Sequence, residues 1–471
     1  MTKVDPVQAL ADKQSEWMDL SLEDKASLLQ RLLDRVTGTS METYIDLLGN
    51  PDAAMMGYDP ETTDEGKCEA STIAFLYVAV VHGAIQKLLQ AYTSSSPPRP
   101  VHQQENSSEG QQSNAIIIQT FPLAFEDKMG PYGKAQSHVW LQQGSTPAHN
   151  NVTADAVSET LQANGKTGAM VVLGAGNHCF LSINDVLHGL FVENSVVFLK
   201  HHPLRGHQDA IVRHIFAPLM ERGFFATELD VSIERTKEVV YHSAVSKVHL
   251  TGGKATHDAI VWGAGSNKLG TPILKAQMTS ELGCVTPWIL APQEWTSKEL
   301  DHQVKHLFAS IYSNAGANCN SPKVVLMTKD WPHAKEFVGR LQQEMEQSPL
   351  PVAYYPGSKE RWDRFRNAYP TLSRTYGNVS TSGRGLSSSA TVLPWLVIDT
   401  ITVDLSTADG RLAAQNEYAF RNEPFAPVVT FVQVDSLSSA VRVGQHLPVW
   451  VPQLHSSGPQ EQQSRCRKSH I

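Results

Sequence analysis

Apolar residues recur along the chain at two different spacings, and each spacing predicts a different kind of element. Residues 9–36 carry apolar side chains at the three- and four-residue intervals of an amphipathic helix, and Ser21 stands three residues before Asp24, as at a helix start. Residues 68–92 form a second helical segment, rich in Ala, Val and Leu, whose polar flanks argue against a membrane span. Both segments are predicted to be scaffold helices.

Short, continuous apolar runs dominate the middle of the chain. Residues 169–173 (AMVVL) form such a run, as expected of a parallel strand covered on both faces, and a turn of small residues separates it from a helical pattern at 183–192. Further strands are predicted at 195–200, 247–250 and 323–327. Strand, turn and helix in this order predict an α/β protein whose sheet presents polar side chains at its carboxyl edge.

The region before this pattern is less regular. Residues 93–114 are rich in Ser, Pro and Gln and are predicted to be an exposed loop. Strands are predicted at 115–120 and 138–142, with turn material at 130–133 between them. From these residues alone the strands are predicted to form an ordinary edge hairpin.

Composition narrows the class of protein. A chain of 471 residues should form more than one domain, and its formal charge of −8 gives no electrostatic reason to expect nucleic acid or an anionic membrane as partner. The first twenty residues lack a signal-peptide core, and no eighteen apolar residues run together. Five scattered cysteines have no metal-site spacing. We therefore expect a soluble, cytoplasmic protein without a metal site, whose partners are small molecules or other proteins.

The strongest candidate chemistry is a thiol and a carboxylate, Cys319 and Glu281, which stand 319 − 281 = 38 residues apart. A cysteine on a turn of small residues exposes its sulfur to a substrate, and a nearby carboxylate can take a proton from a thiol or from water. The pair suits covalent catalysis followed by hydrolysis. The competing interpretation is that Cys319 is a small, buried hydrophobic residue, as free cysteines usually are.

The amino-acid sequences around Glu281 and Cys319 add to this argument. The segments SELG at 280–283 and NAGANC at 314–319 resemble the aldehyde dehydrogenase superfamily, whose general base lies in Glu-Leu-Gly-Gly and whose nucleophile ends Asn-Ala-Gly-Gln-x-Cys. The resemblance implies that Glu281 is the general base and Cys319 the nucleophile. Cys284 replaces the second Gly of the first motif, and Ala317 replaces the Gln of the second.

Two segments that precede Glu281 in the sequence also resemble family motifs, one for binding the oxyanion and one for binding the cofactor. Asn177 matches the family's Pro-Trp-Asn-x-Pro, whose Asn donates to the oxyanion, although the Trp and both prolines are missing. Its alternative is a turn asparagine that satisfies its own backbone. Lys200 matches the Lys of Lys-Pro-x-Glu, which holds the adenosine ribose. No Glu follows here, and the neighbours His201 and His202 could favour a 2′-phosphate, so NADP stands beside NAD.

Two further segments resemble cofactor contacts. Gly252 and Gly253 stand at the family's Phe-Thr-Gly-Ser turn, where the pyrophosphate rests on a helix end, although a plain turn between a strand and a helix has the same composition. Glu423 and Phe425 match Glu-x-Phe-Gly-Pro-Val, whose Glu grips the nicotinamide ribose and whose Phe packs beside the ring. Without the motif they would be a solvated acid and a core aromatic residue.

The resemblance implies an aldehyde dehydrogenase-like α/β fold with a Rossmann-type cofactor domain, an α/β catalytic domain and a small β-hairpin that helps to build the family's oligomer. The predicted regions are a helical part with its loop (1–114), the strand excursion (115–150), the nucleotide-binding region (151–280), the catalytic domain (281–434) and a tail (435–471). Residues 444–471 show neither strand nor helix period and are predicted to be a disordered or foreign tail. One interpretation is a truncated or alternatively spliced product.

The expected reaction is oxidation of an aldehyde to a carboxylic acid with NAD or NADP through a thiohemiacetal and a thioester on Cys319. Two alternatives remain open at this point. One is an acyl-transferring or reductive relative, which would tolerate loss of Glu281. The other is a catalytically inactive homologue that acts as a binding or structural protein, for which the unusual C-terminus would be a reason.

Overall fold

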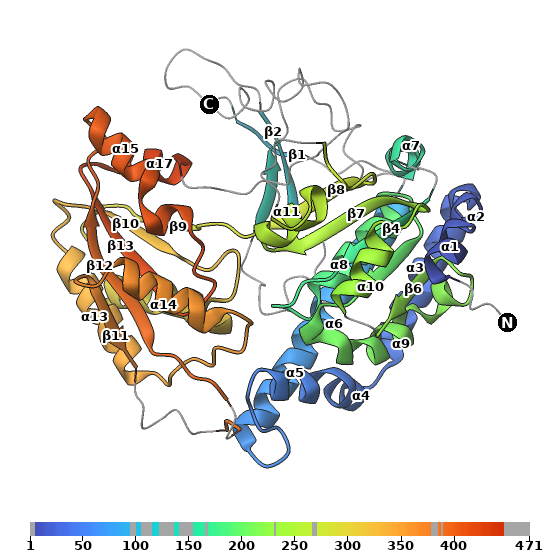
Figure 1. Cartoon of the computed structure of the whole chain (residues 1–471), viewed down its shortest axis with the longest axis horizontal. Coiled ribbons are helices and arrows are strands. Elements are labelled where there is room, and N and C mark those ends of the chain that lie inside the picture. Colours follow the sequence, from blue (N-terminus) through green and yellow to red (C-terminus); the bar gives the residue numbers. More distant parts are fainter. Residues whose placement is uncertain are drawn as a thin grey trace.

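The computed structural model describes residues 5–94, 100–104, 115–121, 136–140, 154–164, 168–229, 232–265, 271–377, 385–387 and 390–446. Within these residues the chain forms two α/β domains, each built on a five-stranded sheet, and a separate three-stranded sheet (Figure 1). The strands are β1 (Pro100–Gln104), β2 (Ala115–Phe121), β3 (Ser137–Trp140), β4 (Ala169–Leu173), β5 (Val197–Lys200), β6 (Phe225–Glu228), β7 (Val245–Gly252), β8 (Gln277–Leu282), β9 (Pro287–Leu290), β10 (Val324–Thr328), β11 (Ser373–Tyr376), β12 (Trp395–Thr402) and β13 (Val428–Val434). The helices are α1 (Pro6–Ala11), α2 (Gln14–Asp19), α3 (Leu22–Gly38), α4 (Met41–Tyr44), η1 (Ile45–Gly49), α5 (Asn50–Met55), α6 (Asp64–Thr93), α7 (Ala154–Asn164), α8 (Leu181–Phe191), η4 (Pro203–Gln208), α9 (Asp209–Met220), α10 (Ile233–Val240), α11 (Lys254–Trp262), α12 (Ser297–Tyr312), η5 (Ser313–Gly316), α13 (Ala334–Gln347), α14 (Ser358–Ala368), α15 (Ala408–Asn416), α16 (Tyr418–Arg421) and α17 (Leu437–His446).

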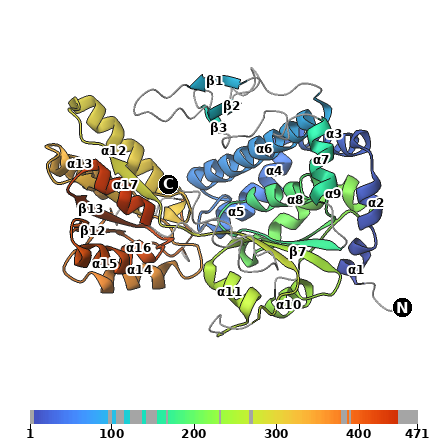
Figure 2. The same ribbon diagram turned by 90° about the horizontal axis from the view of Figure 1, so that it is seen from above.

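The first domain contains a fully parallel sheet in the order β6-β5-β4-β7-β8. This order reverses between β4 and β7, as in a Rossmann-type fold, where the reversal opens a crevice at the carboxyl ends of the strands. Figure 2 shows α10 and α11 on one face of the sheet and α6, α8 and α9 on the other. The central strand β4 is buried along its whole length, as its apolar run predicts. The predicted Rossmann-type region is thus confirmed.

The second domain contains the sheet β11-β12-β13-β10-β9, which is parallel except for the antiparallel edge strand β11. Successive residues of its central strands enter two separate cores. On β10, Val324 and Leu326 pack with α14, α16 and α17, whereas Val325 and Met327 pack with α12 and α13. Helices therefore cover both faces, and the carboxyl edge of the sheet is left for other contacts.

The N-terminal helices form the scaffold that the sequence predicts. Ser21 caps α3 through its side chain, which accepts the backbone N–H of Asp24, and the Asp24 carboxylate returns a bond to the Ser21 backbone. Helix α6 is the one described helix that is long and apolar enough to span a membrane by length and composition. Its buried residues, among them Tyr77, Val81 and Ile85, belong to the core of the first domain.

The structure corrects three predicted boundaries. Residues 100–104, inside the predicted loop 93–114, form β1 and pair with β2, so the excursion is a three-stranded sheet. The predicted domain boundary at 280/281 lies inside β8, so the first sheet extends to Leu282. The second domain also continues past residue 434, because Ala440 and Val443 of α17 are buried in its core. Residues 447–471 of the predicted tail lie outside the described residues.

Candidate active site

The carboxyl ends of β4, β7 and β8 border one cavity. From the first domain it is lined by Gly176, Asn177, Leu181, Thr251, Gly252, Gly253, Glu281, Leu282 and Gly283. From the second domain it is lined by Cys319, Tyr355, Arg361, Glu423 and Phe425. The cavity therefore lies at the crevice where the strand order of the first sheet reverses, with the second domain closing it.

The structure brings the predicted thiol and carboxylate together. Sγ of Cys319 lies 3.6 Å from Oε1 of Glu281, within hydrogen-bonding distance for sulfur. Glu281 reaches this place because it stands at the end of β8, and Cys319 follows the short helix η5. Cys319 is half-buried and lines the cavity, so the interpretation of Cys319 as a sealed core cysteine is wrong.

The loop before Cys319 has an unusual backbone. Asn314 and Ala315 have φ of 55° and 52°, and Gly316 has φ of 74°. At Gly316 a side chain would also collide with the second domain, because a Cβ there would lie 2.5 Å from the carbonyl oxygen of Ala426. Left-handed conformations at two non-glycine residues are strained, and such strain gathers at functional sites.

The surroundings of Cys319 keep its thiol protonated. Burial, followed by the charges of Glu281 and Glu423, raises the pKa of Cys319 to about 11. At neutral pH the sulfur therefore carries its proton and can donate it to the Glu281 carboxylate. Attack by this sulfur requires a base, and Glu281 is in place to act as one.

Asn177 stands between the first sheet and the nucleophile loop. Its Nδ2 donates to the carbonyl of Ala317 at 3.1 Å, and its own carbonyl accepts from Nδ2 of Asn314 at 3.0 Å. The hydroxyl of Tyr354 also donates to that carbonyl, at 3.2 Å. Because a side-chain amide has two N–H donors, one remains to meet a ligand oxygen at the cavity. Asn177 therefore contacts the nucleophile loop rather than only its own turn.

The turn at Gly252 and Gly253 opens helix α11 toward the cavity. Gly253 is the N-cap residue of α11, and a Cβ built on it meets nothing within 4 Å. The unpaired N–H groups at a helix start attract anions, and the absence of a side chain lets a phosphate group approach the backbone. These residues fit a dinucleotide pyrophosphate.

Lys200 differs from the other predicted site residues. It lies at the end of β5, is 4 % exposed, and is not among the described residues that line the cavity. Its neighbours are also engaged, since the His201 ring contacts Asp209 at 3.1 Å and Thr227 at 2.9 Å. The prediction that Lys200 and His201 meet the cofactor therefore receives no support from their placement.

His202 is involved in packing between the domains. A Cβ built on Gly176 would lie 2.5 Å from its ring, and the ring stacks on Tyr355 with centroids 5.9 Å apart. Burial, aided by the charges of Arg205 and Lys200, lowers the pKa of His202 to about 4. It is therefore neutral at physiological pH and gives no positive charge for a phosphate.

Glu423 projects into the site beside Gly283 and accepts the backbone N–H of Cys284. Burial raises its pKa to about 7, against the opposing charges of Lys323 and Arg361. Lys323 is itself buried, donates to the carbonyl of Gly316 at 2.7 Å, and has a pKa lowered by burial to about 8. The acid of Glu423 and the amine of Lys323 thus interact through their charges in a shielded environment, and both also interact with the cysteine thiols.

Phe425 is the second predicted site residue that lines the cavity from the second domain, beside Glu423. It adopts φ of 42°, and its ring makes an edge contact with Tyr355 at a centroid distance of 4.8 Å. Arg361 holds the turn, because its guanidinium donates to the carbonyls of Pro424 at 2.8 Å and Phe425 at 3.2 Å.

Sequence reasoning missed four residues of the site, and each lacks a motif. They are Lys323, Tyr354, Tyr355 and Arg361. The one signal that could have found Lys323 is its place directly before the buried strand β10, where a lysine is unusual.

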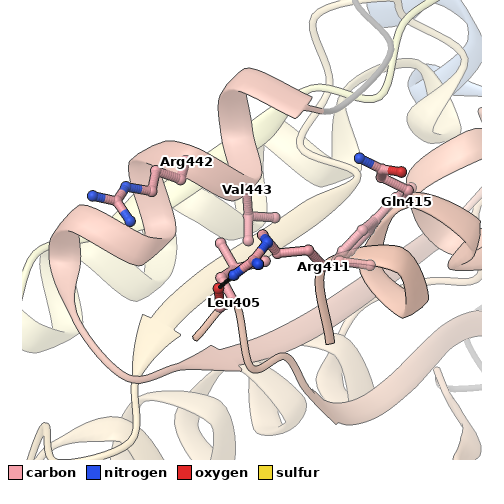
Figure 3. Close-up of a pocket in the computed structure, with 7 residues that line it drawn as sticks. Leu405, Arg411, Gln415, Arg442 and Val443 are labelled. Carbon is pink, nitrogen blue, oxygen red and sulfur yellow. Dashed lines mark hydrogen bonds between the residues drawn. The ribbon is translucent and has the colours of Figure 1, made fainter. Parts of the chain in front are cut away.

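A second cavity lies wholly within the second domain, near α15 and α17 (Figure 3). It is lined by Leu405, Arg411, Ala414, Gln415, Phe420, Arg442 and Val443. None of the predicted site residues lies there. The cavity between the domains is therefore the candidate active site.

Comparisons with known proteins agree with this geometry. Residues 146–353 match the model of the aldehyde dehydrogenase family. A search of curated proteins finds no match. Among solved structures, the succinic semialdehyde dehydrogenase of Streptococcus pyogenes, solved with NADP+, is similar with a TM-score of 0.57 at 16 % identity, over 93 % of this chain and 78 % of that one.

Two other solved structures show the same likeness. The betaine aldehyde dehydrogenase of Staphylococcus aureus, solved with NAD+, gives a TM-score of 0.57 at 13 % identity over 94 % of this chain and 72 % of that one. The NADP-dependent glyceraldehyde-3-phosphate dehydrogenase of Bacillus halodurans gives a TM-score of 0.57 at 14 % identity, over 95 % of this chain and 81 % of that one. These likenesses show that the chain has the aldehyde dehydrogenase fold, and residues 146–353 of it match the model of the aldehyde dehydrogenase family.

Proposed function

We propose that the protein oxidises an aldehyde to a carboxylic acid, with NAD or NADP as electron acceptor. The observation that carries the proposal is the 3.6 Å contact between Sγ of Cys319 and Oε1 of Glu281 at the carboxyl edge of a Rossmann-type sheet. The cofactors of similar structures support the choice of acceptor, since one was solved with NAD+ and two with NADP or NADP+.

In the first step Cys319 forms a bond to the carbonyl carbon while its proton passes to Glu281. The free amide hydrogen of Asn177 and the backbone N–H of Cys319 are the donors for the oxygen that becomes negative. Donors fixed in this way before the reaction typically contribute a few kcal/mol, about 3 kcal/mol for one donor. Asn177 is suited to this role because the Asn314 and Tyr354 contacts hold its backbone.

The cofactor has binding groups on both walls. The α11 start at Gly252 and Gly253 would hold its pyrophosphate, and Glu423 and Phe425 would hold the nicotinamide half. When bound, the nicotinamide supplies the two-electron acceptor that the reaction requires. The residues of this chain orient the two partners and exclude water around them.

Glu281 has a second task after oxidation. A thioester in a shielded pocket rarely meets hydroxide at neutral pH, so a base must take a proton from water. Glu281 can act as this base once it has released to solvent the proton that it took from Cys319. Glu281 is at the surface of the cavity, where water can approach it. Hydrolysis then releases the acid and returns the Cys319 thiol.

The test is a comparison of Cys319→Ala, Glu281→Gln and Cys68→Ala. Aldehyde-dependent reduction of NAD or NADP should be abolished by Cys319→Ala and unchanged by Cys68→Ala, because Cys68 is exposed on α6 and is not among the described residues that line the cavity. Glu281→Gln should slow formation of the acyl adduct on Cys319, because the thiol loses its base, and should slow its hydrolysis as well, so that the adduct persists and intact-protein mass spectrometry detects it after long incubation.

Two outcomes would favour other functions. Full turnover of Glu281→Gln in the presence of an added thiol would indicate an acyl-transferring enzyme. Absence of binding of both NAD and NADP to the wild-type protein would indicate a non-catalytic relative.

A further inference from the structure

The peptide groups on both sides of Asn177 are held by side chains from outside its own turn. The carbonyl of Gly176 accepts a hydrogen bond from Nε of Arg205 at 3.0 Å. The carbonyl of Asn177 accepts from Asn314 at 3.0 Å and from Tyr354 at 3.2 Å. Two successive carbonyls with fixed directions define the backbone of Asn177, and with it the direction of its side chain.

Arg205 is in turn oriented by a buried acid. Its Nη1 lies 2.5 Å from Oδ2 of Asp52, and the two side chains are 3 % and 1 % exposed. The other oxygen of Asp52 contacts Nε2 of His207 at 2.5 Å. Arg205 and His207 belong to η4, which follows β5, whereas Asp52 belongs to α5 near the start of the chain. The three residues therefore connect an N-terminal helix to the turn that carries Asn177.

A purely structural role does not account for this arrangement. Two apolar side chains would join α5 to η4 at least as well, because burying an ion pair costs about as much as its attraction returns. An apolar residue at position 205 would, however, leave the Gly176 carbonyl without this donor. The planar guanidinium places one nitrogen beside the Asp52 carboxylate and donates from another to Gly176, which the single ammonium of a lysine cannot do in the same geometry.

We propose that Arg205, oriented by Asp52, is a positioning residue for the oxyanion-binding amide of Asn177. It is not among the described residues that line the cavity and acts through the Gly176 carbonyl. The inference rests on the proposed function, in that it assigns Asn177 to the oxygen of the adduct on Cys319. It does not depend on the oxidation step, since any acyl transfer to Cys319 forms the same kind of oxyanion.

The test is a double-mutant cycle between positions 205 and 177. Arg205→Lys keeps a positive charge for Asp52 but loses the Nε donor, and it is combined with Asn177→Ala. The readout is acylation of Cys319 by p-nitrophenyl acetate without cofactor, measured as the initial burst of p-nitrophenolate. Arg205→Lys should slow the burst about tenfold or more in the wild-type background and less than about twofold in Asn177→Ala, because misplacement matters only while the amide is present.

Arg213→Met is the matched control. Arg213 forms an ion pair with Asp209 at 2.5 Å on the neighbouring helix α9, but its hydrogen bonds go to Asp209 and Thr227 and not to Gly176. The burst should be unchanged in this variant. Asp52→Asn, which keeps the shape of the acid, gives a second route to the same result should Arg205→Lys fail to fold, as judged by thermal unfolding.

Equal slowing in both backgrounds would overturn the inference, because Arg205 would then act on the fold at large. No slowing in either background would overturn it as well. Loss of the burst in wild-type protein would contradict the role of Cys319 itself, and with it the proposed function. A normal burst without any aldehyde oxidation would contradict the proposed oxidation but leave the role of Arg205 in place.

Discussion

The carboxylate of Glu423 occupies the space that a side chain at residue 283 would need. A Cβ built on Gly283 would overlap Oε2 of Glu423, and the same carboxylate accepts the N–H of Cys284. A glycine is therefore required at position 283 because a side chain there would displace the Glu423 carboxylate, and not because of the backbone conformation of Gly283 itself.

Gly283→Ala should accordingly weaken cofactor binding. Glu423 must leave its place, and loss of a hydrogen bond to a charged group typically costs about 1.5–3 kcal/mol, which corresponds to a dissociation constant roughly ten- to a hundredfold higher. Fluorescence titration with NAD and NADP measures the dissociation constant. Gly339→Ala on α13, where a Cβ meets nothing within 4 Å, should bind as the wild type does. Unchanged binding in Gly283→Ala would show that Glu423 does not hold the cofactor.

Glu281→Gln should lower the pKa of the Cys319 thiol. The pKa of this group is about 11 because burial and neighbouring carboxylates disfavour the thiolate, and the substitution removes one of those charges. The thiolate should therefore appear at lower pH in the variant. The ultraviolet absorbance of the thiolate, followed against pH with Cys319→Ala as baseline, measures the midpoint. A midpoint that rises or stays would mean that the carboxylate of Glu281 does not act on the sulfur in the free protein.

Patterns within a single stretch of sequence predicted those site residues whose positions are set by one neighbouring strand or turn. The apolar run of β4 predicted the position of Asn177 after the strand, and the sequence motifs predicted Glu281 and Cys319. Each of these predictions needs only the residues next to the site residue in the sequence. Lys200 was different. The apolar run of a fully buried strand does not reveal which way its last residue points, and Lys200 is 4 % exposed and is not among the described residues that line the cavity.

The remaining residues owe their roles to contacts between distant segments. Tyr354 meets Asn177 across 177 positions, and Arg361 meets Phe425 across 64. No local period encodes such a contact. Helix α17 escaped prediction for a related reason, since its buried residues, Ala440 and Val443, are few and become recognisable only against the sheet that they cover.

Arg361 should be needed because it stabilises the strained turn at Phe425. Arg361→Met removes both hydrogen bonds to the turn, and we expect it to raise the dissociation constant of NAD or NADP about tenfold as Phe425 relaxes from its φ of 42°. Arg364→Met is the control, because Arg364 is exposed on the same helix α14. Calorimetric titration measures the affinity.

A second substitution separates strain from loss of contact. Glycine adopts positive φ at no steric cost, so Phe425→Gly should make the turn less dependent on its guanidinium support. The further loss caused by Arg361→Met should then be smaller in Phe425→Gly than in the wild type. Equal losses in the two backgrounds would indicate that Arg361 supports the site in another way.

Lys25 should make the stability of the first domain depend on pH. The side chain is 1 % exposed, its Nζ lies 5.1 Å from the Trp17 ring, and burial lowers its pKa to about 8. In the unfolded chain a lysine titrates near 10.4, so between about pH 8 and pH 10.4 the unfolded state holds more protons and the folded state gains stability as the pH rises.

Lys25→Met removes this dependence. Urea unfolding followed by Trp fluorescence should show the variant more stable than the wild type at pH 7, by about 1–2 kcal/mol after loss of the Trp17 and Leu20 contacts, with the difference closing toward pH 10.4. Lys67→Met, at an exposed lysine of α6, should leave the pH profile of the wild type unchanged. Because the test compares variants at each pH, other titrating groups cancel, and a constant difference between pH 7 and pH 10.4 would mean that Lys25 keeps its charge in the folded protein.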